Sequence, residues 1–210
     1  QKPSDQAGKL HRWSGPVRVS IEFGQSVPQS LHGQDKAIVS TYVQRLETVT
    51  SHPISFTARR ANFHVLVMGK DDNVQLTTRL KQIIPGISTS TLGLFTDLPQ
   101  DIYCLVAAFP PDASSNDYRT AVALVRAEHP DLIRRSCYHE EMAQGLGLAN
   151  DSPQARPSIF NDDDEFALLT THDEMLLKML YDPRLTVGMR LEEARPIVAE
   201  LAQELAGGGS

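Results

Sequence analysis

Residues 137–151 read CYHEEMAQGLGLAND, a helical pattern that carries a row of polar side chains. Residues four apart on a helix share a face, so Glu140 and Gln144 project together, with Glu141 beside them. Gly147 can adopt a positive φ, which ends a helix by turning the chain back. The segment therefore predicts a helix that presents polar groups on one face.

The residues behind this helix extend the polar group. Asn150 and Asp151 follow the glycine closely, and either side chain can turn back towards the same face. We expect amide and carboxylate oxygens to converge there from the helix and from the tail behind it. The plainer alternative is an amphipathic helix that ends at a glycine and presents its polar side chains to solvent.

The segments before the helix predict a mixed α/β (α+β) domain. Residues 17–23 alternate apolar and polar side chains, as a half-buried strand does. Residues 38–49 repeat at helical spacing, with Asp35 as a plausible cap. The turn-rich residues 88–100 are expected to loop across the surface. Strands are also expected at residues 54–57, 62–68, 101–109 and 121–126, and a helix at residues 73–84.

Three helices are expected in the last third of the chain. The first covers residues 131–148 and contains the polar segment, with Asp131 able to cap it. A capping box at residues 171–174 opens a second helix that runs to Leu180. The last covers residues 191–205. This order of elements fits a mixed sheet with the polar helix lying beneath a cleft.

The polar segment resembles the metzincin zinc motif H-E-x-x-H-x-x-G-x-x-H of the zincin metalloproteases. In this resemblance the three histidine ligands fall on Glu140, Gln144 and Asn150. The general-base glutamate falls on Glu141, and the glycine of the motif falls on Gly147. The base and glycine positions match, whereas all three ligand positions depart from the family.

The resemblance extends from residue 101 to residue 185, and more vaguely back to Val17. Phe160 stands where metzincins place the methionine of a tight turn, and residues 170–181 resemble their closing helix. This implies a zincin-like mixed sheet, an active-site-type helix and a closing C-terminal helical subdomain. The chain also resembles a proteobacterial family of secreted, zincin-like proteins without an assigned function. The residues expected to line the cleft are His139, Gly147 and Phe160.

The departures decide which metals the site suits. Catalytic zinc takes three protein ligands, usually imidazoles. Glu140 can ligate zinc, but Gln144 and Asn150 offer only neutral amide oxygens, which suit calcium, magnesium or manganese better. We therefore expect no bound cofactor and no zinc. If an oxygen-loving cation binds, Asp151 is expected to join Glu140.

Two further possibilities concern carboxylates. Glu141 and Asp151 form a metal-free general acid and base pair if they lie at a suitable distance. Residues 161–165, NDDDE, lack the spaced calcium-loop pattern, so a solvated acidic loop is expected there. His139 stands in an H-E-x-x-A register without a second ligand on the helix, which favours a packed residue over a metal ligand.

The composition is that of an ordinary globular domain. The 210 residues include 40% hydrophobic and 22% charged side chains. The formal net charge of -6 argues against nucleic acid as a partner, because phosphate binding needs clustered cations. No apolar stretch approaches the roughly 20 residues that span a bilayer, so no transmembrane segment is expected.

The cysteines and the ends of the chain point to export. Cys104 and Cys137 are expected to form a disulfide between a strand and the polar helix, with two buried free thiols as the alternative. Residues 1–13 are expected to be a flexible segment, as after removal of a signal peptide, or to start at an arbitrary boundary. Residues 14–206 are expected to form one zincin-like domain, and residues 207–210 a linker remnant.

The leading hypothesis is an exported, periplasmic or secreted protein, with envelope anchoring before processing left open. It has lost zinc proteolysis and acts as a non-catalytic binding or interaction module for a protein or cell-envelope partner. The alternative is an active hydrolase, a peptidase or a cell-wall hydrolase, that uses Glu141 as general base with an atypical metal site. A third hypothesis is a purely structural envelope protein.

Overall fold

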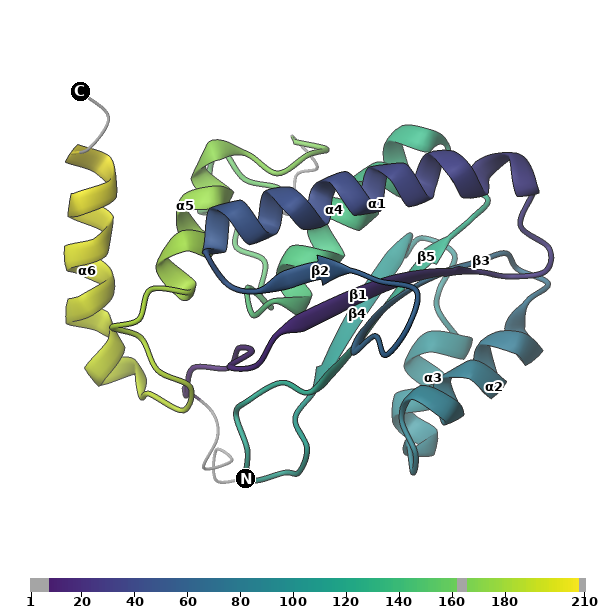
Figure 1. Ribbon diagram of the computed structural model, residues 1–210, viewed down its shortest axis with the longest axis horizontal. Helices are drawn as coiled ribbons and strands as arrows, with labels where there is room; N and C mark the ends of the chain where they lie inside the picture. Colours follow the sequence, from purple (N-terminus) through teal and green to yellow (C-terminus); the bar gives the residue numbers. More distant parts are fainter. Residues whose placement is uncertain (1–7, 162–165, 208–210) are drawn as a thin grey trace.

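The computed structural model describes residues 8–161 and 166–207, and these residues contain a five-stranded mixed sheet (Figure 1). The strand order is β2-β1-β3-β5-β4. Neighbouring strands pair in parallel, except that the edge strand β4 runs antiparallel to β5. The predicted α/β (α+β) class is thus confirmed. The strands are β1 Val17–Phe23, β2 Ile54–Phe56, β3 Phe63–Met68, β4 Cys104–Phe109 and β5 Thr120–Arg126.

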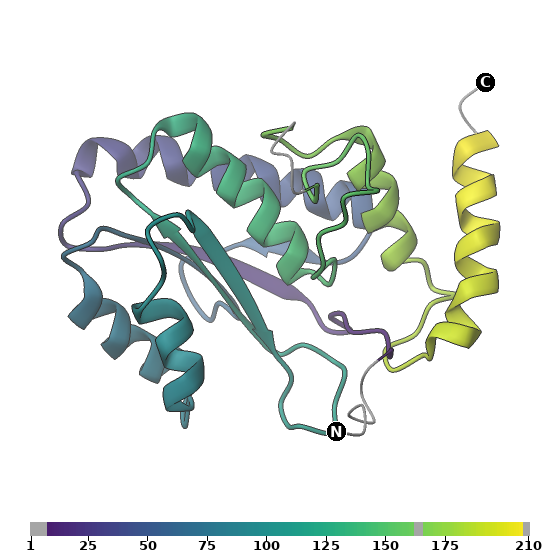
Figure 2. The ribbon, with the colours of Figure 1, turned by 180° about the vertical axis from the view of Figure 1, so that it is seen from behind.

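Helices cover both faces of this sheet. Helices α1 and α4 lie on one face, and α2 and α3 lie on the other (Figures 1 and 2). Helix α5 packs against α1, and α6 stands beside α5 at one end of the molecule. None of the helices in the described ranges combines the length and the apolar character needed to cross a membrane. The helices are α1 Gln29–Thr50, α2 Asn73–Ile83, α3 Thr89–Thr96, α4 Asp131–Gly145, α5 Thr171–Leu180 and α6 Leu191–Gly207.

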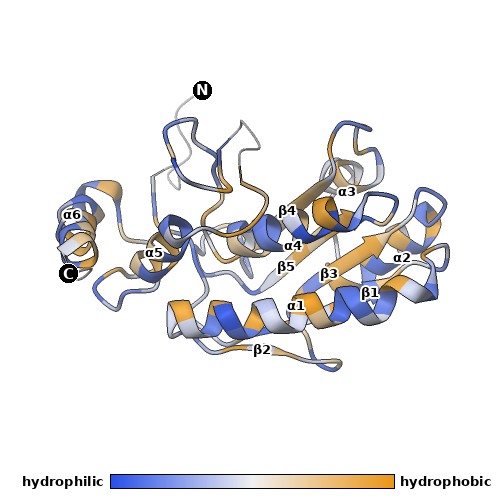
Figure 3. Cartoon of the chain, turned by 90° about the horizontal axis from the view of Figure 1, so that it is seen from above, coloured by the Kyte–Doolittle hydropathy of each residue, from blue (hydrophilic) through white to orange (hydrophobic). Residues whose placement is uncertain are grey.

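The central strand β3 explains why both faces need cover. Its sequence, FHVLVM, is buried at every position, as expected for a strand between two helical layers. Side chains alternate between the faces, so Val65 and Val67 join the core under α1 and α4. Leu66 and Met68 join a second core under α2 and α3. Figure 3 shows the hydrophobic colour along β3 and β4 and the mixed colours of α1.

The segment before β1 is packed where the structure describes it. Lys9 forms a β-bridge with Arg190, and Trp13 is 1% exposed. The indole Nε1 of Trp13 donates a hydrogen bond to the Gly145 carbonyl oxygen at 2.9 Å. Residues 8–13, expected to be part of a flexible segment, are therefore packed: residues 8–10 pair with the segment before α6, and His11 and Trp13 lie against the end of α4. At the other end, Gly207 is the last residue of α6 rather than part of a linker.

Helix α3 corrects the loop expected at residues 88–100. Ser88 accepts a hydrogen bond from the backbone N–H of Thr91, which caps the helix. Phe95 is 1% exposed and packs in the core under α2 and α3. The Ser and Thr residues that suggested a turn are therefore the start of a short helix, because these residues favour N-caps as strongly as turns.

Two helix starts also differ from the prediction. Helix α1 begins at Gln29, so Asp35 lies inside it and is 1% exposed rather than a cap. The capping box of α5 pairs Thr170 with Asp173, one residue earlier than expected. Both errors arise because several adjacent polar residues can cap a helix, and packing selects one of them.

Candidate functional site

The start of α4 is fixed to α1 by a buried ion pair. Arg134 donates two hydrogen bonds to the carboxylate of Asp35, both at 3.0 Å. The Tyr138 hydroxyl donates a third bond to the same carboxylate at 2.9 Å. Asp35 and Arg134 are 1% and 2% exposed, so the pair is withdrawn from water. Helix α4 therefore has a firmly set orientation, and the directions of its other side chains follow from it.

His139 lies on the α1 side of α4. Its ring stacks on Tyr42 with centroids 4.0 Å apart, and its Nδ1 accepts a hydrogen bond from the Leu169 N–H. Burial lowers the pKa of His139 to about 3, and the cations Arg135 and Arg45 lower it further. The ring borders a separate hollow of about 330 Å³ between α1 and α4. His139 is thus a packed residue that does not join the carboxylates of the polar segment.

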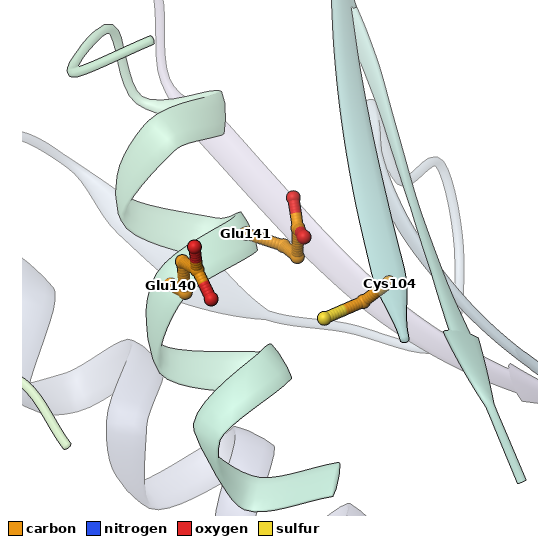
Figure 4. Close-up of side chains that lie close together, drawn as sticks. All are labelled: Cys104, Glu140 and Glu141. Atoms are coloured by element: carbon orange, nitrogen blue, oxygen red, sulfur yellow. The ribbon is translucent and has the colours of Figure 1, made fainter. Parts of the chain in front are cut away.

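Glu141 points the other way, towards β4 (Figure 4). Its side chain is 5% exposed, and its Oε2 has no hydrogen-bond partner among the described residues. Burial raises the pKa of Glu141 well above its usual value, and the nearby carboxylates of Glu140 and Asp151 raise it further. Burial therefore disfavours the ionised carboxylate that a general base needs.

The predicted disulfide is confirmed and lies at this site. Cys104 of β4 is joined to Cys137 of α4, with a Cα–Cα distance of 5.8 Å. Ligand atoms of Cys104, Glu140 and Glu141 lie within 4.8 Å of one another. The disulfide thus ties the edge strand to the helix at the place where the two glutamates lie (Figure 4).

The residues behind α4 are brought together only in part. The amide of Gln144 donates a hydrogen bond to a carboxylate oxygen of Asp151 at 2.9 Å, as the expected convergence requires. Asn150 is exposed, like Asp151. Glu140 is half-buried on the same helix and has interactions of its own. The arrangement is a polar surface around Gln144 beside one buried carboxyl group.

Gly147 turns the chain, as predicted, and permits close packing. Its φ is 132°, and a Cβ atom there would lie 2.7 Å from the His11 carbonyl oxygen. A Cβ at Gly145 would lie 2.5 Å from the Phe63 ring. The end of α4 is therefore pressed between β3 and the segment before β1. Gly147 is covered by that segment instead of lying beside Glu141.

Phe160, in the turn before α5, was expected to line the cleft, but it is 3% exposed and belongs to the main core. The turn is held by Asp173, which accepts hydrogen bonds from the Ser158 hydroxyl and the Ile159 N–H. The same carboxylate completes the capping box of α5. Phe160 thus stabilises the fold as a core residue. The acidic run that continues to residue 165 lies, from residue 162 on, outside the described residues.

The donor groups at this site do not fit a zinc ion. Gln144 and Asn150 supply amide oxygens, and zinc sites use imidazole nitrogen, thiolate or carboxylate. Cys104 is the remaining candidate, but its sulfur is bonded to Cys137 and is not a thiolate. The carboxylates at the site are Glu140, the exposed Asp151, which accepts the hydrogen bond of Gln144, and the buried Glu141, whose ionised form burial disfavours. The residues present therefore give no basis for zinc chemistry.

Several residues that build the site were missed in the sequence. Asp35 stands four residues before Val39, on the apolar stripe of α1, and this position was the signal for burial. The lone tryptophan, Trp13, was the signal that a polar segment packs. Nothing in the sequence marked the contact of Cys104 with the two glutamates.

The comparisons with known proteins place the chain in a family. No curated protein matches it. Residues 2–200, nearly the whole chain, match the model of one protein family. The chain is a member of this family, Protein of unknown function (DUF2927).

Proposed function

We propose that this protein is an exported, non-catalytic binding protein with a zincin-like fold and a degenerate metal site. The observation that carries the proposal is the fate of the motif positions. Gln144 is hydrogen-bonded to Asp151, Asn150 is exposed, and Glu141 is buried beside the disulfide. These side chains form a polar surface. They supply none of the imidazole ligands with which zincins hold a metal that activates water.

The zincin-like part of the proposal is supported by element order and position. The polar helix α4 lies next to the antiparallel edge strand β4, and Gly147, two residues after the end of the helix, has a positive φ. A turn and the helix α5 follow in the order that the resemblance implies. Export is supported by the disulfide, because disulfides persist in oxidising compartments and are rare in the cytosol.

The proposed recognition surface surrounds Gln144. It is polar and carries the carboxylates of Glu140 and Asp151, so it suits a protein or envelope partner that offers cations or hydrogen-bond donors. To test it, binding to isolated envelope fractions is measured for Asp151→Lys and for Asp97→Lys, an exposed control at the end of α3. The proposal expects at least a tenfold loss for the first only. Equal binding by both variants rejects this surface.

Metal content tests the degenerate site. Protein purified without chelators is expected to carry no stoichiometric zinc. Gln144→His together with Asn150→His is expected to raise zinc affinity at least tenfold, because one carboxylate and two imidazoles form a ligand set that zinc enzymes use. Asn150→His alone is the matched control. One equivalent of zinc in the natural protein contradicts the proposal.

The second candidate is a hydrolase that uses Glu141 as its base. One observation favours it: the Oε2 of Glu141 is buried and has no hydrogen-bond partner among the described residues, as a functional carboxyl group can be. Turnover of a broad peptide library and of cell-wall fragments separates the candidates. Cleavage that is lost in Glu141→Gln establishes the hydrolase, and no cleavage by either protein supports the binding protein.

A further inference from the structure

A cavity of about 460 Å³ lies on the opposite side of the sheet from α4. It opens where β3 and β5 end, beside α2 and α3, and ligands of α/β proteins often bind at the carboxyl ends of parallel strands. Its volume is in the range of about 300–1,000 Å³ that small-molecule sites occupy. The floor is apolar and is formed by Met68, Leu76, Phe95 and Leu124.

The rim carries a cation held in place by neutral groups. Arg126, the last residue of β5, donates hydrogen bonds to the carbonyl oxygens of Leu98 at 2.5 Å and Gln100 at 3.5 Å. No carboxylate pairs with its guanidinium in the part of the chain that the structure describes. The guanidinium is therefore oriented without being neutralised, and it retains its charge for a ligand.

His129 adds an unsatisfied polar atom to the same wall. Its Nε2 is buried and has no hydrogen-bond partner within residues 8–161 and 166–207. Two contacts hold His129 in place. The Tyr103 ring packs against the His129 ring with centroids 4.6 Å apart, and the backbone carbonyl oxygen of His129 accepts a hydrogen bond from Arg134. Leaving a buried polar atom without a partner is unfavourable, so a ligand that satisfies it is favoured.

The charge of the rim selects the sign of the ligand. The charged residues that line the pocket are the cations Lys70 and Arg126 and the anion Glu128, which leaves an excess of positive charge in a chain whose net charge is -6. Lys70 is exposed, and it forms no ion pair within the described ranges. An oriented arginine in a concave, apolar site attracts carboxylate or phosphate groups.

We propose that this pocket binds a small organic anion. Its carboxylate or phosphate group contacts Arg126 and Lys70, and its apolar body lies over Phe95 and Leu76. This inference does not depend on the function proposed for the α4 side, because the two sites share no residue. Ligands of this kind include acyl and aryl carboxylates and phosphate monoesters.

Calorimetric titration with octanoate, octyl phosphate and octanol tests the proposal, since these probes share one chain and differ in the head group. Octanoate or octyl phosphate is expected to bind at least tenfold more tightly than octanol, and the stronger of the two identifies the head group. Arg126→Gln is expected to weaken binding of that anion at least tenfold. Arg135→Gln, an exposed arginine on α4, is the matched control and is expected to change nothing.

Lys70→Gln guards against a merely structural effect of the Arg126 change. This exposed side chain supports no described element, so the variant is expected to keep its melting temperature and still lose at least threefold in affinity. Equal affinity for octanol and the two anions overturns the proposal. So does an unchanged affinity in both Lys70→Gln and Arg126→Gln.

Discussion

The two faces of the sheet use their polar residues differently. On the α4 face, the side chains of α4 are largely bonded to other protein groups: Arg134 to Asp35, His139 to Leu169, and Gln144 to Asp151. On the α2 face, Arg126 is oriented by carbonyl groups and keeps its charge, and an atom of His129 has no partner among the described residues. The polar side chains of α4 therefore mainly stabilise the fold, whereas Arg126 and His129 keep a capacity to bind a ligand.

Two glutamates show that each face also holds the opposite case. Burial alone would raise the pKa of Glu22 of β1, but hydrogen bonds from His64 and Arg79 outweigh it and lower the pKa to about 2. Glu141 of α4 is buried, and its Oε2 has no hydrogen-bond donor among the described residues, so its pKa is raised. The ionised form is therefore favoured for Glu22 and disfavoured for Glu141.

The largest effect is expected when α4 loses its anchor. Arg134→Met leaves the carboxylate of Asp35 buried with only the Tyr138 hydroxyl, so the free energy of unfolding should fall by about 3–5 kcal/mol. Urea unfolding measures it. Arg184→Met is the control, because Arg184 pairs with Glu204 at the surface, and it should be nearly neutral. Equal effects of the two changes would show that α4 is no more firmly anchored than the surface.

The disulfide should come next. Reduction of Cys104–Cys137 removes a link across 33 residues, and in the chain-entropy model the loss of stability is about 3–4 kcal/mol. Hydrogen exchange should then become faster in β4 and α4 and stay slow in α2, which lies on the other face. An unchanged melting temperature under reductant would contradict this prediction, and uniform exchange would remove the contrast between the faces.

Most of the fold could be predicted from the sequence, because period and burial agree along it. The alternation of apolar and polar residues predicts the strand Val17–Phe23, and a nearly continuous apolar run predicts the strand Phe63–Met68. Helix α3 was not predicted, because Ser and Thr are as common at helix N-caps as in turns. The sheet order and the antiparallel direction of β4 depend on contacts between distant segments, which local patterns do not contain.

The site was predicted less completely. The spacing of Glu140 and Gln144 put both on α4, and the bond from Gln144 to Asp151 agrees with the expected convergence. The spacing did not reveal that α4 is enclosed between α1 and β4. For that reason His139 turned out to face Tyr42, and Glu141 the disulfide. The pocket at Arg126 has no sequence motif, since its residues come from three separate segments, 68–76, 95–100 and 124–129.

A smaller, pH-dependent effect should separate the two glutamates. Glu22→Gln should destabilise the protein at pH 7 by about 1–2 kcal/mol, reduced by the partial exposure of the group. A lowered pKa contributes stability that is complete above the ordinary pKa of 4.5 and is lost as pH falls towards about 2. The difference between Glu22→Gln and the natural protein should therefore shrink below pH 4.5.

Glu141→Gln should behave in the opposite way. A carboxyl group whose pKa is raised in the folded state loses stability as pH rises above 4.5, because only the unfolded chain ionises. The variant should equal the natural protein at pH 4 and be the more stable of the two at pH 7. Urea unfolding between pH 3 and pH 8 measures both variants. If both glutamine variants are destabilised at pH 7, the contrast between the faces is wrong.

The smallest effect is expected at the surface proposed for recognition. The hydrogen bond from Gln144 to Asp151 is exposed, so water replaces it readily, and Gln144→Ala should change the free energy of unfolding by less than about 1 kcal/mol. A double-mutant cycle with Asp151→Ala isolates the bond itself, and its coupling energy should be about 0.5 kcal/mol or less. Gly145→Ala, one residue away, is the opposite case, since its Cβ would meet the buried Phe63 ring. A coupling energy well above 1 kcal/mol would mean that Gln144 and Asp151 hold the end of α4 in place, and this surface would then be part of the scaffold.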